Sequence, residues 1–200
     1  MFEYDAVYKV KTDVKSVALT FDIGWGKKTA GMVLEVLERK NAKDVTFFVA
    51  APTVIAHPEV IRRIRDMGFE IGSHGYLHNN YSEHSDEWIQ EQVEKAEKAI
   101  QSLSGVTPKL IRTPNGEFDQ RVLKKLHSMG YLTIHSSIDS IDWMNPGTDI
   151  IVCRVLSGVH PGAIILLHAS DTAEQTADAL PRIIDGLRDM GYKFVQCRNL

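Results

Sequence analysis

Short apolar runs typical of β-strands alternate with longer segments of helical period along almost the whole 200-residue chain. The expected strands cover residues 17–21, 45–50, 69–71, 109–111, 132–135, 163–167 and 193–196. Between them, apolar residues recur at helical spacing, for example at Leu180, Ile183, Ile184 and Leu187. Because strands that alternate with helices form parallel sheets, this pattern predicts an α/β domain. Both an open doubly wound sheet and a barrel remain compatible with it.

Glycines mark the ends of three expected helices. Gly68, Gly130 and Gly191 each follow a segment of helical period, and each lies between a methionine and an aromatic residue that opens an expected strand. A glycine in this position commonly ends a helix in the left-handed conformation. The similarity of the three junctions indicates either an internal repeat or, as we expect, one glycine-capped solution used three times.

Composition restricts the class of protein further. The absence of low-complexity tracts and of Pro/Ser-rich linkers predicts one domain, residues 15–200, preceded by an N-terminal extension, residues 1–14. A formal net charge of −3 gives no reason to expect a nucleic-acid partner or an anionic membrane surface. No apolar run reaches the length of about 18 residues that a membrane-spanning helix needs.

Neither the cysteines nor the first residues identify the cellular compartment. Cys153 and Cys197 are expected to be two unpaired thiols, although the sequence does not show whether they meet in space. The first residues lack the basic and apolar regions of a signal peptide.

Residues with catalytic or metal-binding side chains follow five of the expected strands. They are Asp22; His74 and His78; Arg112; Asp139 and Asp142; and His168. The carboxyl ends of parallel strands lie on one face, where α/β barrels build their active sites. A sheet without a site has no reason to collect such residues at one end. The pattern therefore predicts an enzyme with its site at the mouth of a barrel.

Each residue also has a simpler interpretation. Asp22 can cap the following helix, and His74 and His78, whose i, i+4 spacing suits a metal, can be unrelated surface histidines. Arg112 can be an ordinary surface arginine, and His168 a core imidazole with a hydrogen-bond partner.

Asp139 and Asp142 can be turn formers. Taken together, these interpretations require five coincidences. The remaining histidines are expected at the surface; they are His57, His84, His127, His135 and His160.

Five short motifs occur in the order found in a known family. They are Thr20-Phe21-Asp22, Ser73-His74 with His78, Arg112-Thr113-Pro114, Asp139-Ser140-Ile141-Asp142-Trp143 and Leu166-Leu167-His168. This pattern, which covers roughly Lys15 to Cys197, resembles the NodB-homology polysaccharide deacetylases of carbohydrate esterase family 4. The resemblance implies a distorted (β/α)7 barrel that removes N-acetyl groups from an amino-sugar polymer.

A narrower resemblance concerns the segments Phe21–Gly26, Leu167–Asp171 and Ala179-Leu180-Pro181. They are similar to the sporulation-associated PdaB-type subgroup. That similarity implies peptidoglycan of the cell wall or spore as the acetylated glycan partner. It also implies action outside the cytoplasm, through an export signal or membrane anchor upstream of Met1.

The resemblance assigns acid–base chemistry to four residues. It implies that Asp22 is the general base and that Arg112 holds and orients the Asp22 carboxylate. It also implies that Asp139 pairs with His168 and keeps this imidazole able to act as the acid. These roles suit amide hydrolysis, which needs an activated water and a proton for the departing amine.

Four further residues are implied to bind the substrate. Pro114, Trp143 and Leu166 would shape the pocket for the acetyl group. Asn115 stands where the family usually has an aromatic residue, a small departure because only its backbone N–H would be needed.

The metal site departs from the family pattern more seriously. The resemblance implies that His74 and His78 bind Zn²⁺, or another divalent metal such as Co²⁺. The third family ligand is an aspartate directly after the base, and here that residue is Ile23. Because catalytic zinc normally has three protein ligands, weaker binding is expected.

Three functions therefore remain open. The first is a working deacetylase that is slow or uses a different metal. The second is a glycan-binding protein that kept the groove and lost turnover. The third is a hydrolase of another amide or of a small acetylated metabolite. Retention of Asp22, Arg112, Asp139 and His168 favours the first, because a binding module needs no oriented acid and base.

Overall fold

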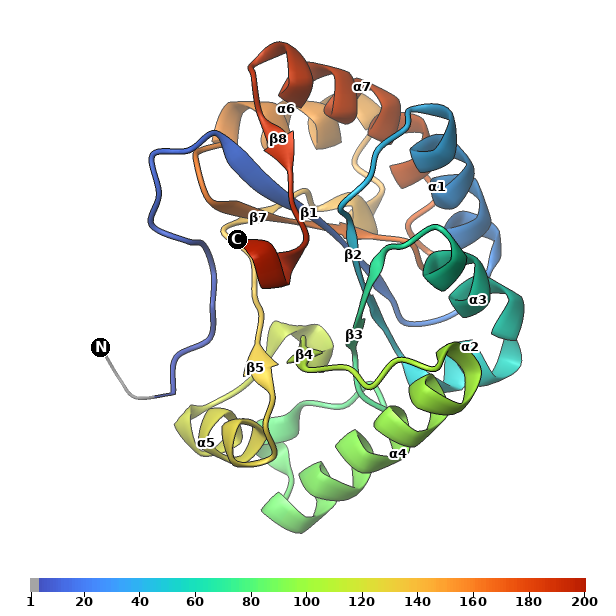
Figure 1. The fold of residues 1–200 in the computed structure, drawn as a ribbon, viewed down its shortest axis with the longest axis vertical. Coiled ribbons are helices and arrows are strands. Elements are labelled where there is room, and N and C mark those ends of the chain that lie inside the picture. Colours follow the sequence, from blue (N-terminus) through green and yellow to red (C-terminus); the bar gives the residue numbers. More distant parts are fainter. Residues whose placement is uncertain (1–3) are drawn as a thin grey trace.

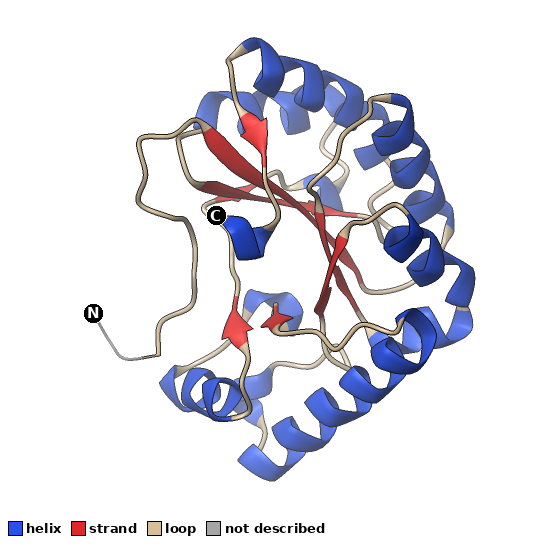
Figure 2. Ribbon diagram, in the orientation of Figure 1, coloured by secondary structure: helices blue, strands red, loops and turns tan. Residues whose placement is uncertain are grey.

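The computed structural model describes residues 4–200 and shows a parallel sheet rolled into a partial barrel, with the helices on its outside (Figures 1 and 2). The strands are β1 (Ser16–Ile23), β2 (Thr46–Val49), β3 (Glu70–Ser73), β4 (Leu110–Ile111), β5 (Leu132–Thr133), β6 (Ile138–Asp139), β7 (Ala163–His168) and β8 (Lys193–Phe194). Their order in the sheet is β5-β4-β3-β2-β1-β7-β6, and β8 pairs separately with β1. This arrangement confirms the expected distorted (β/α)7 barrel.

All expected strands are present, although several are shorter than their apolar runs. The structure adds β6, which the sequence did not predict, because a strand of two residues is too short to display a period. β6 pairs with β7 through Ile138 opposite Ile165 and Asp139 opposite Leu166. Asp139 therefore belongs to a strand of its own.

The helices follow the strands as the periodicity predicts. They are α1 (Lys28–Arg39), α2 (Ala51–Ala56), α3 (Pro58–Asp66), α4 (Asp86–Ser104), α5 (Gln120–Ser128), α6 (Thr148–Gly158) and α7 (Thr176–Asp189). The predicted glycine caps are confirmed, since Gly68, Gly130 and Gly191 have φ angles of 76°, 82° and 83° after α3, α5 and α7. No helix among the described residues combines the length and the apolar character needed to cross a membrane.

The two faces of β1 bury different kinds of residue. Successive side chains of a strand point to opposite sides of the sheet. Val17, Leu19, Phe21 and Ile23 belong to the large apolar cluster that the sheet shares with the outer helices. The alternate positions, which include Thr20 and Asp22, therefore point into the barrel.

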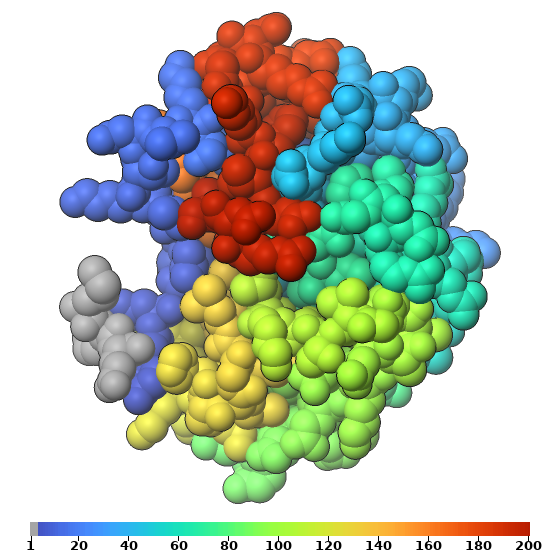
Figure 3. All heavy atoms as spheres, in the orientation of Figure 1, coloured from blue at the N-terminus to red at the C-terminus, as the bar shows by residue number. Residues whose placement is uncertain are grey.

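Apolar side chains fill the inside of the barrel on the side away from the carboxyl ends of the strands. Ala18, Phe48, Leu110, Ile134, Ile164 and Cys197 form one buried cluster. Cys197 comes from the C-terminal turn, residues Cys197–Asn199, which lies over the centre of the face seen in Figure 3 and is coloured red there. Cys153 is exposed and Cys197 is buried, and both are free thiols, as expected.

The N-terminal segment spans the gap between β5 and β7. Val7 donates its N–H to the Thr133 carbonyl at 2.9 Å and accepts from the His135 N–H at 2.8 Å. Val10 donates to the Gly162 carbonyl at 2.9 Å, directly before β7. The stretch expected as an extension, residues 1–14, is thus hydrogen-bonded to the barrel where it is described; residues 1–3 lie outside the described residues.

Replacing Gly162 with alanine tests whether this segment rests against the barrel. Both Gly162 and Gly130 have left-handed φ angles, 74° and 82°, but a Cβ at Gly162 would lie 1.9 Å from the Val10 carbonyl oxygen, whereas one at Gly130 meets no atom within 4 Å. We expect Gly162→Ala to lower the free energy of unfolding by about 1–3 kcal/mol more than Gly130→Ala, the usual cost of overpacking. Urea denaturation measures both losses, and equal losses would contradict the contact.

Candidate active site

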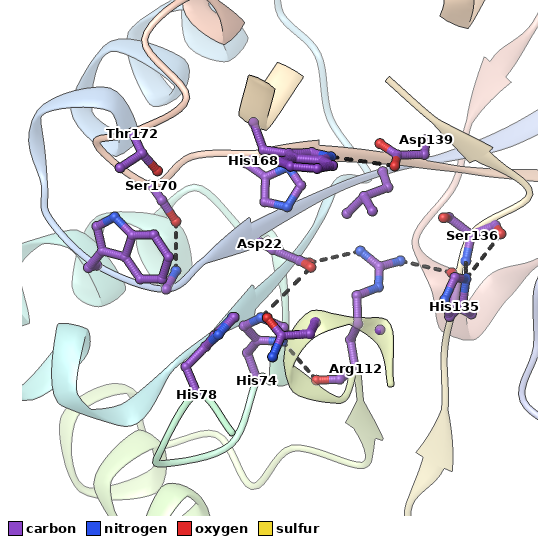
Figure 4. Close-up of a pocket in the computed structure, with 16 residues that line it drawn as sticks. Asp22, His74, His78, Arg112, His135, Ser136, Asp139, His168, Ser170 and Thr172 are labelled. Carbon is purple, nitrogen blue, oxygen red and sulfur yellow. Dashed lines mark hydrogen bonds and ion pairs between the residues drawn. The ribbon is translucent and has the colours of Figure 1, made fainter. Parts of the chain in front are cut away.

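A pocket of about 530 Å³ lies at the carboxyl ends of the strands (Figure 4). The residues around it come from strand ends and loops that are far apart in the sequence. They are Asp22, Gly24, Trp25, His74, His78, Arg112, Asn115, Gly116, His135, Ser136, Asp139, Trp143, Leu166, His168, Ser170 and Thr172. The expectation that five segments meet at one mouth of the barrel is therefore confirmed.

Pro114 is the one residue of the expected site that does not line this pocket. It is buried at the start of a short 3₁₀ turn, Pro114–Gly116, where its side chain faces the backbone of Gly75. Pro114 therefore supports the loop and does not form the pocket wall. Its neighbour Asn115 reaches the pocket from a left-handed conformation with φ of 57° and donates a side-chain hydrogen bond to Asn80 at 2.8 Å.

Asp22 and Arg112 form a buried ion pair at the base of the pocket. Arg112 Nη1 donates to Asp22 Oδ1 at 2.8 Å and to Thr20 Oγ1 at 2.9 Å. The guanidinium also lies 4.3 Å from the centre of the Phe48 ring, which covers its face. Both side chains are almost fully buried, so their geometry is fixed before any ligand arrives.

Two backbone carbonyls accept the remaining guanidinium hydrogen bonds. Arg112 Nη2 donates to the His135 carbonyl at 2.9 Å and Nε to the Ile134 carbonyl at 3.4 Å. Burial alone would raise the pKa of Asp22, but the positive charge of Arg112, with smaller contributions from His74 and His168, holds it below its ordinary value. Asp22 is therefore a carboxylate at neutral pH and can accept a proton.

Asp142, and not Asp139, pairs with His168, which corrects the expected role of Asp139. His168 Nδ1 lies 2.7 Å from Asp142 Oδ1, and the His168 backbone N–H donates to Oδ2 of the same carboxylate at 2.7 Å. The Thr176 hydroxyl donates to Oδ2 at 2.6 Å. Since a carboxylate only accepts, Nδ1 carries a proton, and Nε2 is the nitrogen free to act in the pocket.

Asp139 shapes the turn that places Asp142 behind the imidazole. Its Oδ1 accepts the Ile141 backbone N–H at 2.8 Å. Ile141 has a φ of 55°, an unfavourable left-handed conformation for a β-branched residue. Asp139 also receives a long hydrogen bond, 3.5 Å, from the Trp143 indole at the pocket wall. The sequence could not separate these roles because the two carboxylates are only three residues apart.

The pKa of His168 is raised above its ordinary value of 6.5. Burial alone would lower this pKa, but the hydrogen bond to Asp142 and the charges of Asp142, Asp22 and Asp139 outweigh it. His168 is therefore able to hold a proton under conditions where Asp22 is ionised. Two groups with pKa values moved apart in this way form a matched acid and base.

His74 and His78 converge beside Asp22, as their spacing predicted. Their ring centres are 5.2 Å apart, and His74 Nε2 lies 3.9 Å from Asp22 Oδ2. His74 Nδ1 lies 2.8 Å from the Arg112 carbonyl, an acceptor, so Nε2 keeps a free lone pair toward the pocket. Burial lowers the pKa of His74 to about 4, which keeps its imidazole neutral, the form that binds metals.

The described residues do not complete a metal site. Ile23 is fully buried in the outer apolar cluster, because it follows Asp22 on β1 and points to the other face of the sheet. No group of three or more His, Cys, Asp or Glu side chains in the described part of the chain is arranged to hold a metal ion. His74 and His78 are thus two neighbouring imidazoles, whereas catalytic zinc usually has three protein ligands.

Several residues of the pocket wall were not predicted from the sequence. His135, expected at the surface, lines the pocket and stacks on Tyr8 with ring centres 4.5 Å apart. Ser136, Ser170 and Thr172 follow the same strands as the predicted residues. They too lie after strand ends, where functional groups collect. They were not predicted because serine and threonine are common in loops and do not by themselves indicate a site.

The chain is similar to known polysaccharide deacetylases. Residues 9–134 match the family described as "Polysaccharide deacetylase". The "Peptidoglycan-N-acetylglucosamine deacetylase" of Bacillus cereus is 33% identical over 181 residues, which are 90% of this chain and 66% of the relative. The "Peptidoglycan-N-acetylmuramic acid deacetylase PdaA" of Bacillus subtilis is 33% identical over 202 residues, with coverages of 99% and 76%.

A solved structure with the same fold is described as a pseudoenzyme. This carbohydrate esterase 4 family protein from Bacillus anthracis superimposes with a TM-score of 0.92 at 29% identity, over 100% of this chain and 69% of that chain. The chain spans only 58%, 66% and 40% of the length of three curated relatives that it matches.

The assignment of Asp142 as the partner of His168 predicts a difference between two variants. Asp142→Asn removes the hydrogen-bonded charge and should lower the pKa of His168 clearly; Asp139→Asn should lower it less, because its charge is the weakest of the named contributions. NMR titration of the His168 ring measures this pKa in both variants, whether or not they are catalytically active. A larger fall in Asp139→Asn would contradict the assignment.

The same shift has a consequence for stability. A raised pKa in the folded state means that protonated His168 stabilises the fold fully below its ordinary value of 6.5. This contribution is lost as the pH rises through the raised value.

Proposed function

The chain belongs to the polysaccharide deacetylase family, the NodB-homology carbohydrate esterases of family 4, and on that premise we propose that it removes N-acetyl groups from an amino-sugar polymer. One observation carries the proposal. Asp22 and His168 are partners in register on the adjacent strands β1 and β7, the first held ionised and the second able to keep a proton. A protein that only binds glycan has no need for this pair.

The two groups supply complementary steps of amide hydrolysis. Asp22 accepts a proton from water as the water oxygen bonds to the acetyl carbonyl carbon. His168 then donates its proton to the sugar nitrogen as the carbon–nitrogen bond breaks, which releases acetate and the free amine. Arg112 holds the Asp22 carboxylate in place, and Asp142 holds the His168 ring.

The pocket wall suits a small apolar group beside a sugar. Leu166 and Trp143 would contact the acetyl methyl, and the backbone N–H of Asn115 would approach the carbonyl oxygen as charge develops there. A volume of about 530 Å³ accommodates one N-acetylated sugar, since ligand pockets commonly enclose about 300–1,000 Å³.

We further propose that Zn²⁺, or another divalent metal such as Co²⁺, binds weakly at His74 and His78. A bound divalent cation would act as a Lewis acid toward the acetyl group. Because the described side chains leave the usual ligand set incomplete, none of the steps above relies on it.

Peptidoglycan of the cell wall or spore is the polymer that we propose. Two relatives are named for deacetylation of its N-acetylglucosamine and N-acetylmuramic acid units. Because this polymer lies in the cell wall, we propose that the protein acts outside the cytoplasm.

A second candidate is a glycan-binding protein without turnover on the same fold. Ile23 favours it, because the ligand position after the base is occupied by a side chain packed in the core. The similar structure described as a pseudoenzyme adds support.

Acetate release decides between the two candidates. We expect release from acetylated chito-oligosaccharide or peptidoglycan when Zn²⁺ or Co²⁺ is added. Asp22→Asn should reduce the rate by about 10²–10⁴-fold, the usual contribution of a positioned acid or base. Release that persists in Asp22→Asn would exclude Asp22 as the base. Glycan binding without release under any metal would establish the binding protein.

Substitution of Ile23 tests the metal proposal. We expect Ile23→Asp to raise zinc affinity at least tenfold, or about 1.4 kcal/mol, by returning a ligand to the site. Without metal it should be less stable than wild type, because a carboxylate enters an apolar cluster, and zinc should restore its melting temperature.

Ile23→Asn is the matched control. It buries a polar group of the same shape and should show the same loss of stability without recovery in zinc. Equal zinc affinity of Ile23→Asp and wild type, measured by calorimetry, would mean that side chain 23 stays turned toward the core.

A further inference from the structure

Trp25 is a large aromatic side chain at the pocket rim that the proposed chemistry does not use. It follows Asp22 in the loop between β1 and α1, lines the pocket, and remains 46% exposed. Single exposed apolar residues are common on proteins and need no explanation. Trp25 differs from them because the backbone on both sides of it is held in place.

Hydrogen bonds from two other segments, α2 and the loop after β7, fix the peptide groups around Trp25. Gly24 donates its N–H to the Ser170 hydroxyl at 2.8 Å, and its carbonyl accepts from the Thr53 hydroxyl at 2.6 Å. The Trp25 carbonyl accepts the Asp171 N–H at 3.2 Å. Rotation of this loop would break all of these bonds together.

Asp171 fixes the other end of the loop. Its carboxylate accepts from the backbone N–H groups of Lys27 at 3.3 Å and Thr29 at 2.9 Å. Gly26 has a φ of 79°, and a Cβ there would overlap the Asp171 carboxylate, so the loop needs glycine at this point. The backbone that carries the indole is thus already ordered. A ligand that binds to Trp25 therefore loses little affinity to the ordering of this loop.

The indole stands beside one end of the pocket. Its ring meets His78 at 76°, with ring centres 5.5 Å apart, so the two rings do not stack, and the 46% exposure of Trp25 leaves part of the indole open to a ligand. Ser170 and Thr172 lie on the same side of the pocket as His78, opposite His135 and Ser136 (Figure 4). Thr172 is exposed there and offers a hydroxyl.

We propose that Trp25 forms a second sugar subsite, stacking against the sugar next to the one whose N-acetyl group enters the pocket. A pyranose ring presents C–H groups on its faces and hydroxyls at its rim, which match an open indole face and the Thr172 hydroxyl. The proposal rests on the proposed function only in taking the ligand to be an amino-sugar polymer. The subsite makes the protein bind oligosaccharides in preference to single sugars.

Calorimetry with two probes tests the subsite. Trp25→Ala should weaken binding of tetra-N-acetylchitotetraose about tenfold, in line with the energy of an aromatic stacking contact. It should leave the weaker binding of N-acetylglucosamine, which fills the pocket alone, within about twofold. Trp88→Phe is the control, because Trp88 does not line the pocket and should bind both probes as wild type does.

Fluorescence gives a second readout that a merely structural role would not produce. The part of the wild-type emission that is lost in Trp25→Ala belongs to Trp25, one of 3 tryptophans in the chain. Tetrasaccharide should shift its emission to shorter wavelength, and the monosaccharide should not.

The outcomes separate the subsite from catalysis. Tetrasaccharide binding that Trp25→Ala weakens, without acetate release, supports the subsite while the deacetylase proposal fails. Unchanged affinity in Trp25→Ala together with unchanged Trp25 emission overturns the subsite, as does failure of the wild-type protein to bind the tetrasaccharide.

Discussion

The buried ion pair between Arg112 and Asp22 is the interaction on which the rest of the site depends. A guanidinium and a carboxylate removed from water are costly unless nearly all their hydrogen bonds are made, and breaking such a pair costs about 3–5 kcal/mol. Arg112 meets this condition by bonding to Thr20, Asp22 and the carbonyls of Ile134 and His135. It therefore connects β1 to the segment after β5 and fixes the Asp22 carboxylate before any ligand arrives. The N-terminal segment adds to this support, since Val7 accepts the hydrogen bond of the same His135 backbone.

Strand alternation gives β1 two separate roles at its end. Asp22 points into the barrel and belongs to the site, whereas Ile23 points outward and belongs to the core. An isoleucine at this position adds packing to the outer layer and brings no side-chain ligand toward His74 and His78. The chain thus pairs an ionised Asp22 with a His168 of raised pKa, while its described residues form no group of three metal-binding side chains. This combination is why turnover and glycan binding have to be measured separately.

Much of the fold and part of the site followed from the pattern of residues. Periodicity and glycine caps predicted the helices and most strands, because burial on one face leaves a regular trace in the sequence. Asp22, His74, Arg112 and His168 were predicted together because parallel strands end on one side. The roles of Asp139 and Asp142 were not separable, since a turn with left-handed Ile141 decides which carboxylate reaches His168.

The α/β class, the order of the elements and the family motifs can be predicted from the residues, because they depend on local spacing and residue type. Which groups touch becomes known only in the folded molecule. The fold placed His135 and Trp25 at the pocket, removed Pro114 from its wall and turned Ile23 into the core. Contacts between segments distant in the chain depend on strand register, side-chain direction and the closure of the barrel. These are properties of the packed molecule that no local pattern encodes.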